Sequence, residues 1–98
     1  MPNKNYLKGR RYEYEVIKRW KERGYEATRT AGSHSSADVI AWRTDRKVSF
    51  IQCKVTDSMA TATRLAKRFR EDSIPSSNYH TVLTIKVKGS KIPIEVTI

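Results

Sequence analysis

The sequence predicts a small α/β fold in which a mixed five-stranded sheet is flanked by two helices. Three observations support it: a helical apolar pattern near the start, a near-continuous apolar run in the middle, and a second helical pattern followed by two apolar strands. A chain of 98 residues can bury one hydrophobic core but not two. We therefore expect residues 1–98 to form a single domain.

The first helix is expected from Tyr6 to Arg23, because apolar residues recur there at helical spacing. They are Tyr12, Val16, Ile17 and Trp20. Gly24 follows, and a glycine commonly lies just beyond the end of a helix. Glu13 precedes Ile17 by four residues and Trp20 by seven, so its carboxylate is expected on or beside the buried stripe.

Three strands are expected next, at Tyr25–Arg29, Asp38–Trp42 and Val48–Val55. Residues 30–36, between the first two, are small and polar and are expected to form a loop. In the third strand, alternation places Gln52 and Lys54 on one face together with Val48 and Phe50. The other face carries Ile51, Cys53 and Val55.

A second helix is expected at Met59–Glu71, then strands at Tyr79–Val87 and Ile92–Ile98, joined by a hairpin turn at residues 88–90. The outward face of this helix is basic, and it either contacts phosphates or is simply solvated. Its cations are Arg64, Lys67, Arg68 and Arg70. Trp20 and Trp42 are expected in the core.

The net charge of +10 is the strongest signal in the composition. Residues 1–50 hold twelve Lys/Arg and six Asp/Glu, and residues 51–98 hold eight and four, so the basicity belongs to the whole folded body. Such a domain is expected to bind a polyanion, and nucleic acid is the leading candidate.

The sequence also indicates a compartment. No apolar run reaches the roughly 18 residues of a membrane span, and no secretory signal is found, so we expect no membrane partner. Cys53 is the only cysteine, which fits the reducing cytoplasm of a prokaryote or of a virus-infected host cell. The two histidines, His34 and His80, are far apart, which argues against a structural zinc site.

Asp38 and Gln52 place a carboxylate and an amide oxygen on neighbouring expected strands. Hydrolysis of a phosphodiester needs an activated water, a neutralised oxyanion and a tolerated leaving group, and Mg²⁺ supplies much of all three. Mg²⁺ binds hard oxygens and keeps several waters, so two or three protein oxygens suffice. The Cys53 backbone carbonyl and the Glu13 carboxylate complete the candidate set, and Lys54 is placed to act on the attacking water or the developing charge.

Each of these residues has a plainer interpretation. Asp38 alone fits a turn or a strand cap, Lys54 a strand end that extends to solvent, and Gln52 a solvated face. Their joint occurrence with Glu13 favours a catalytic site.

Five short motifs occur in one order: Lys8-Gly9 with Glu13, Gly24-Tyr25, Arg29-Thr30-Ala31-Gly32-Ser33, Asp38-Val39-Ile40-Ala41 and Gln52-Cys53-Lys54-Val55-Thr56. This set resembles the archaeal-type Holliday junction resolvases of the PD-(D/E)xK nuclease superfamily. The resemblance runs from about Lys8 to Thr56 and is looser beyond. It implies a small restriction-endonuclease-like core and a homodimer that nicks two opposed strands of four-way junction DNA with Mg²⁺, or with Mn²⁺, and without a small-molecule cofactor.

The resemblance also implies roles for individual residues. Glu13, Asp38 and Gln52 occupy the metal-site positions, Lys54 that of the catalytic lysine, and Ser33 that of a catalytic serine. The expected DNA contacts are Lys8, Arg10, Arg11, Arg29, His34, Arg64, Lys67 and Arg68.

Two positions depart from the family pattern. Gln52 stands where an acidic residue is usual, and it is either natural or an isosteric replacement of glutamate that would trap an inactive complex. Tyr14 follows the helical glutamate where an arginine is frequent, which shifts phosphate binding to residues such as Arg10 or Arg11.

Other functions remain open beside junction resolution. A related nuclease acting on ends, nicks or duplex sites is a second enzyme hypothesis, and a non-cleaving DNA- or RNA-binding module is a third. No helix-turn-helix or zinc finger is apparent, so we expect DNA shape to be recognised through phosphate contacts.

Overall fold

The computed structural model describes residues 4–30 and 37–98. In chain order its elements are α1 (Lys4–Glu22), β1 (Glu26–Arg29), β2 (Val39–Arg43), β3 (Arg46–Thr56), α2 (Met59–Asp72), β4 (Tyr79–Val87) and β5 (Ile94–Thr97). This order confirms the predicted α/β fold with a mixed five-stranded sheet and two helices.

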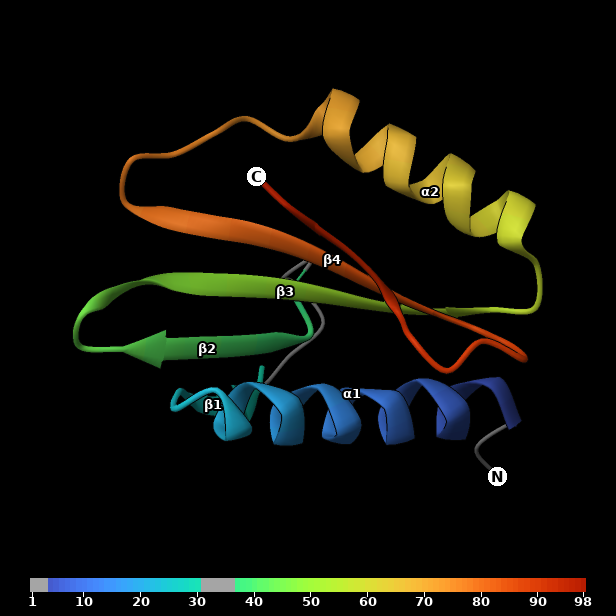
Figure 1. Ribbon diagram of the computed structural model, residues 1–98, viewed down its shortest axis with the longest axis horizontal. Helices are drawn as coiled ribbons and strands as arrows, with labels where there is room; N and C mark the ends of the chain where they lie inside the picture. Colours follow the sequence, from blue (N-terminus) through green and yellow to red (C-terminus); the bar gives the residue numbers. More distant parts are fainter. Residues whose placement is uncertain (1–3, 31–36) are drawn as a thin grey trace.

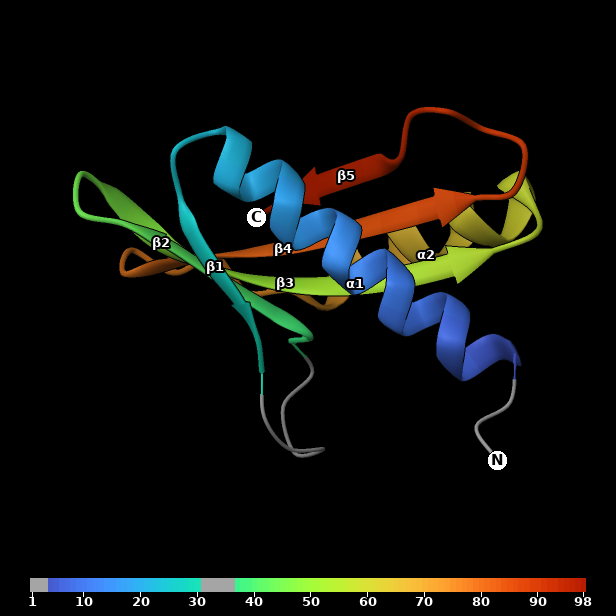
Figure 2. The ribbon, with the colours of Figure 1, turned by 90° about the horizontal axis from the view of Figure 1, so that it is seen from below.

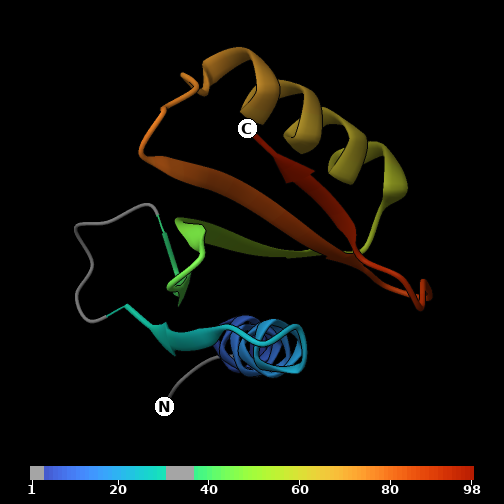
Figure 3. The same ribbon diagram turned by 60° about the vertical axis from the view of Figure 1, so that its left-hand side comes forward.

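The sheet has the strand order β1-β2-β3-β4-β5 (Figures 1 and 2). The first three strands form an antiparallel meander, β3 and β4 run parallel, and β5 returns antiparallel to β4. Parallel neighbours need a crossover connection, and α2 provides it. Figure 3 shows α1 on one face of the sheet and α2 on the other.

The core on the α1 side is built from the predicted helical stripe. Tyr12, Val16 and Trp20 are buried. They form one cluster with Ala27, Val39, Ala41, Ile51 and Val82. The Tyr12 hydroxyl lies 2.6 Å from Oγ1 of buried Thr84, so both polar groups are satisfied inside this core. Glu13 is half-buried beside the stripe, as its spacing predicts.

The core on the α2 side combines small helical residues with larger strand residues. Its buried members are Ala62, Ala66, Leu83, Ile85, Val87 and Val96. The helix begins at Ser58, whose hydroxyl accepts a hydrogen bond from the backbone N–H of Thr61 at 3.3 Å. The capped helix packs against β3, β4 and β5.

Two predictions about the fold were wrong. Trp42 is 40% exposed and not part of the core, because it lies at the β2–β3 hairpin, beside a register irregularity between Ala41 and Arg43. The last strand begins at Ile94, since Pro93 has no N–H to donate to a ladder. Residues 88–93 therefore form a longer connection than a three-residue turn.

Candidate active site

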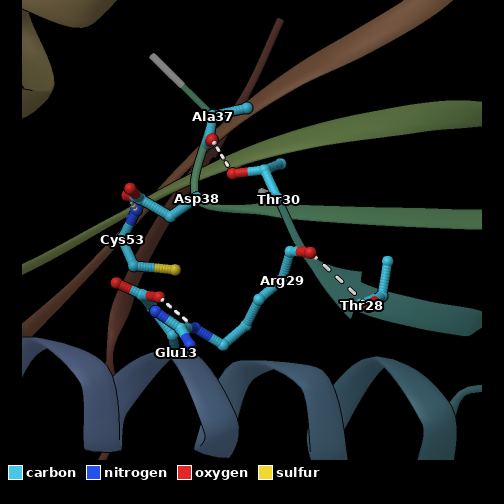
Figure 4. A network of polar contacts seen from close by, with 7 residues as sticks. All are labelled: Glu13, Thr28, Arg29, Thr30, Ala37, Asp38 and Cys53. Atoms are coloured by element: carbon cyan, nitrogen blue, oxygen red, sulfur yellow. Dashed lines mark hydrogen bonds and ion pairs between the residues drawn. The ribbon is translucent and has the colours of Figure 1, made fainter. Parts of the chain in front are cut away.

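Asp38 links the start of β2 to β3 (Figure 4). Its backbone N–H donates to the carbonyl of Ile51 at 2.8 Å, and its Oδ2 accepts a hydrogen bond from the backbone N–H of Cys53, also at 2.8 Å. The Asp38 carboxylate thus accepts the Cys53 N–H, which a backbone carbonyl would accept if β2 extended further. The hydrogen bond from Cys53 holds the Asp38 carboxylate beside β3.

Glu13 approaches the same region from α1. Its Oε1 accepts a hydrogen bond from Nε of Arg29, at the end of β1, at 2.8 Å (Figure 4). The two side chains are 18% and 30% exposed, respectively. The hydrogen bond to Glu13 is the main reason that the pKa of Arg29 is raised.

The Cys53 thiol lies between the two carboxylates. Figure 4 shows its sulfur directed from β3 toward Glu13. Burial raises the pKa of the thiol well above its ordinary value, and the negative charges of Asp38 and Glu13 raise it further. Cys53 therefore stays protonated, as expected of a packing residue and not of a nucleophile. Figure 4 shows the two carboxylates on either side of this thiol, so both lie in one region.

The backbone carbonyl of Cys53 faces the Asp38 side of β3. In an antiparallel ladder, the N–H and C=O of one residue point to the same neighbouring strand. The Cys53 N–H points to Asp38, and β2 begins only at Val39. The carbonyl is therefore directed beyond the end of β2, beside the Asp38 carboxylate.

The side chains of Gln52 and Lys54 lie on the α2 face of the sheet, opposite the side chain of Cys53, as the predicted alternation requires. Both line a hollow of about 390 Å³ between the sheet and α2. The rest of its lining is Leu65, Arg68, Phe69, Asp72, Ser73, Thr81 and Leu83. Val39 pairs with Ile51, so extending the register by one residue sets Asp38 opposite Gln52. The structure thus clusters Glu13, Arg29, Asp38 and Cys53, while Gln52 adjoins the cluster through the backbone.

The donor set suits a hard divalent cation. Within residues 4–30 and 37–98, Oδ1 of Asp38 and Oε2 of Glu13 accept no hydrogen bond. Two carboxylate oxygens, one backbone carbonyl and one amide oxygen are ligands that Mg²⁺ or Mn²⁺ prefers. The described residues contain no group of three His, Cys, Asp or Glu side chains at metal-binding distance, which is consistent with the neutral amide of Gln52.

Tyr14 is part of the site in a way that the sequence analysis missed. The Arg29 guanidinium lies 5.5 Å from the centre of its ring. Hydrogen bonds from Arg10, and secondly from Arg29, lower the pKa of the phenol. The four-residue spacing between Arg10 and Tyr14 on a helix was the available signal. Tyr14 therefore joins Arg10 to Arg29 beside the Glu13 carboxylate.

The other predicted DNA contacts are on the surface. Lys8, Arg10 and Arg11 are exposed on α1, and Arg64, Lys67 and Arg68 on α2. Lys67 and Arg68 form long exposed ion pairs within α2, with Glu71 at 3.9 Å and Asp72 at 4.0 Å. Such pairs are weak and leave the cations available. Ser33 and His34 lie outside the described residues, so their roles stay predictions.

Neither helix in the described part of the chain is both long enough and apolar enough to cross a bilayer.

Comparison with known proteins identifies a family. The model for "Archaeal holliday junction resolvase (hjc)" matches residues 4–69. A solved structure of Hjc, a Holliday junction resolvase from Archaeoglobus fulgidus, superposes with a TM-score of 0.56 at 17% identity, covering 91% of this chain and 83% of that one. At this identity the likeness shows the fold. No match was found among curated proteins. Because the family model spans well over half of its length, the chain belongs to the archaeal Holliday junction resolvase family.

Proposed function

We propose that this chain is a structure-selective endonuclease that resolves four-way DNA junctions by divalent-metal-dependent hydrolysis of phosphodiester bonds. The observation that carries the proposal is the placement of the Glu13 and Asp38 carboxylates on either side of Cys53, at the start of β2. In a family member with a net charge of +10, two carboxylates at one point serve a metal and not the DNA itself.

The metal would be held by Asp38 and Glu13, by the carbonyl of Cys53 and by the amide oxygen of Gln52. When bound, Mg²⁺ or Mn²⁺ would acidify a water and neutralise charge on the phosphate. Arg29 holds the Glu13 carboxylate in place through its 2.8 Å bond. We assign Lys54 to the attacking water or the developing charge, and Ser33 to the phosphate, from their positions in the family motifs.

The exposed cations of α1 and α2 would bind the junction arms. Phosphate contacts set orientation and carry no sequence information, so recognition would depend on the shape of the junction. A protein acting on such a substrate would work in the cytoplasm of a prokaryote or of an infected cell.

A homodimer would match the two-fold symmetry of a junction that is cut twice. An apolar surface on the α2 side of the sheet, near the β2–β3 hairpin, supports this. Phe50 and Tyr79 are in edge-to-face contact there with a centroid distance of 5.3 Å, and Tyr79 is 39% exposed. Val48 is the ladder partner of Tyr79. Sedimentation of Tyr79→Glu should show a monomer that makes unpaired nicks, whereas an unchanged dimer would place the interface elsewhere.

The proposal is tested with four-way junction, duplex and single-stranded DNA, each with and without Mg²⁺. Paired symmetric nicks in the junction alone are expected, and Glu13→Gln should abolish them while junction binding persists. Comparable cutting of plain duplex would contradict junction selectivity and favour a related nuclease. Tight binding without cutting under all conditions would favour the binding-module hypothesis, which the neutral Gln52 side chain makes worth testing.

A further inference from the structure

A second, basic hollow lies at the end of the sheet, apart from the carboxylate cluster. Its volume is about 240 Å³, and it lies where the N-terminal part of α1 meets the ends of β3 and β4. Its described lining residues are Lys8, Arg11, Val55, Asp57, Lys86 and Lys88. Four cations and one carboxylate thus surround a small concave space, which favours an anion.

The cations of this hollow differ in their pairing. Nζ of Lys86 contacts both carboxylate oxygens of Glu15, at 3.1 and 3.2 Å, so its charge is already compensated. Lys8, Arg11 and Lys88 form no ion pair with any carboxylate of the described residues. These three exposed side chains can therefore turn toward a ligand without breaking an existing bond.

The backbone fixes the hollow at a defined place. Val55 and Lys86 are direct partners in the parallel β3–β4 ladder, and the N–H of Lys88 donates to the carbonyl of Thr56 at 2.9 Å. Val55, 37% exposed, contributes an apolar wall. The rim is thus carried by a helix and by two hydrogen-bonded strands, and only the cationic tips are free to adapt.

The hollow and the carboxylate cluster are close enough for one DNA strand to contact both. Lys8 precedes Glu13 by five residues, or about 7.5 Å along α1. Val55 follows Cys53 by two residues, or about 6.6 Å along β3. A DNA strand advances about 3.4 Å along the helix axis per nucleotide, and the path along its backbone is longer, so the hollow is about one to two nucleotides away from a phosphate at the cluster.

We propose that Lys8, Arg11 and Lys88 form a binding site for one phosphodiester of the same DNA strand, about one to two nucleotides from the phosphate at the Glu13–Asp38 cluster. The site rests on the proposed DNA-binding function. It extends that function to Lys88 and to a phosphate close to the cluster on the same strand. It would hold the strand at a second point, so that the phosphate at the cluster is fixed along the strand as well as against the metal ligands.

The test measures binding without a divalent metal, so that it does not depend on cleavage. Lys88→Gln should weaken junction binding about threefold at 100 mM salt and reduce the slope of log affinity against log salt by about 0.9. Lys47→Gln is the matched control, because Lys47 is exposed in β3 and does not line the hollow. If the two variants weaken junction binding equally, the hollow is not a specific phosphate site. Thermal melting of Lys88→Gln checks that folding is unchanged.

Chemical replacement of single phosphates tests the register. In the wild type, a methylphosphonate about one or two nucleotides from the phosphate at the cluster should weaken binding, and in Lys88→Gln the same replacement should add no further loss. Additive losses at that position would contradict the assignment. These binding losses can be observed even if the protein cuts nothing, so failure of the nuclease proposal and failure of this site are distinguishable.

Inorganic phosphate is the second arm of the test. Junction DNA should shift the amide resonances of Val55 and Lys88, and millimolar phosphate should shift the same amides weakly. If phosphate shifts them at low concentration while DNA leaves them unchanged, the hollow binds a free anion and the DNA assignment is overturned.

Discussion

The guanidinium of Arg29 donates from Nε to Oε1 of Glu13 at 2.8 Å and thereby joins the end of β1 to α1 at the candidate active site. Arg29 was expected to contact a phosphate directly. In the structure its first partner is a candidate metal ligand, and the same guanidinium also lies over Tyr14. Arg29 can therefore position Glu13 while the rest of its N–H fork remains available to a phosphate.

Arg29→Gln should reduce single-turnover junction cleavage at least tenfold, because Glu13 loses the bond that orients it. The free energy of unfolding should fall by only about 1 kcal/mol, since the pair is partly solvated. Arg43→Gln is the matched control: Arg43 pairs with Asp45 at 2.7 Å on the β2–β3 hairpin, away from the cluster. Equal losses of cleavage in both variants would contradict a specific role of Arg29 in orienting Glu13.

Asp38→Asn and Asp38→Ala should separate the two roles of Asp38, which are the hydrogen bond to the Cys53 N–H and the binding of the metal. The asparagine carbonyl can still accept the Cys53 N–H, so this variant should keep its stability and lose cleavage and Mg²⁺ affinity. The alanine variant leaves that N–H without its acceptor and should lose about 1–3 kcal/mol as well. Urea denaturation and Mg²⁺-dependent cleavage measure the two effects. An Asn variant that cleaves normally would remove Asp38 from the metal site.

Tyr14→Phe should change the pH dependence of junction binding. The pKa of Tyr14 is lowered by Arg10 and Arg29, so its phenol ionises at lower pH than an ordinary tyrosine, whose pKa is about 10. Ionisation adds a negative charge beside the site, so wild-type affinity should fall as the pH rises toward 10. The Phe variant should show a smaller fall. Absorbance titration at alkaline pH identifies the ionisation, and identical pH profiles would contradict the link.

Most of the fold could be predicted because its determinants are local. The spacing of Tyr12, Val16 and Trp20 fixes the buried face of α1, and strict alternation sets the two faces of β3. The exposure of Trp42 could not be predicted, since it depends on a register irregularity and on how far the helices extend over the sheet. A period-two pattern marks a face but does not show whether another element covers it.

The site was only partly predictable, for a similar reason. Sequence spacing placed Glu13 beside the core and Gln52 next to Lys54. It could not show that the Asp38 carboxylate binds the backbone of Cys53, or that Arg29 turns toward Glu13, because these contacts join residues fifteen and sixteen positions apart. The spacing of Arg10 and Tyr14 was visible, but only the position of β1 brings Arg29 to the same ring.

Cys53 should be protected from alkylation in the folded protein. Burial and the neighbouring carboxylates raise its pKa, so at pH 8 the partly buried thiol is protonated while an unfolded thiol is partly ionised. Iodoacetamide should react much faster in denaturing urea than in buffer. The same difference lowers the free energy of unfolding above roughly pH 9, where only the unfolded state releases the proton. Rapid labelling of the folded protein would contradict a partly buried, protonated thiol.

Gln52→Glu should raise Mg²⁺-dependent junction cleavage at least tenfold and lower the Mg²⁺ concentration for half-maximal rate. The added carboxylate would lie across the ladder from Asp38 and supply the third negative charge that two carboxylates and an amide lack. Without metal, its repulsion with Asp38 should reduce the free energy of unfolding, and Mg²⁺ should restore it. Thr81→Glu, on the adjacent strand and lining the same hollow, is a control for added charge. If the wild type cleaves and Gln52→Glu cleaves no faster, the amide is a sufficient ligand and Gln52 is a working part of the site.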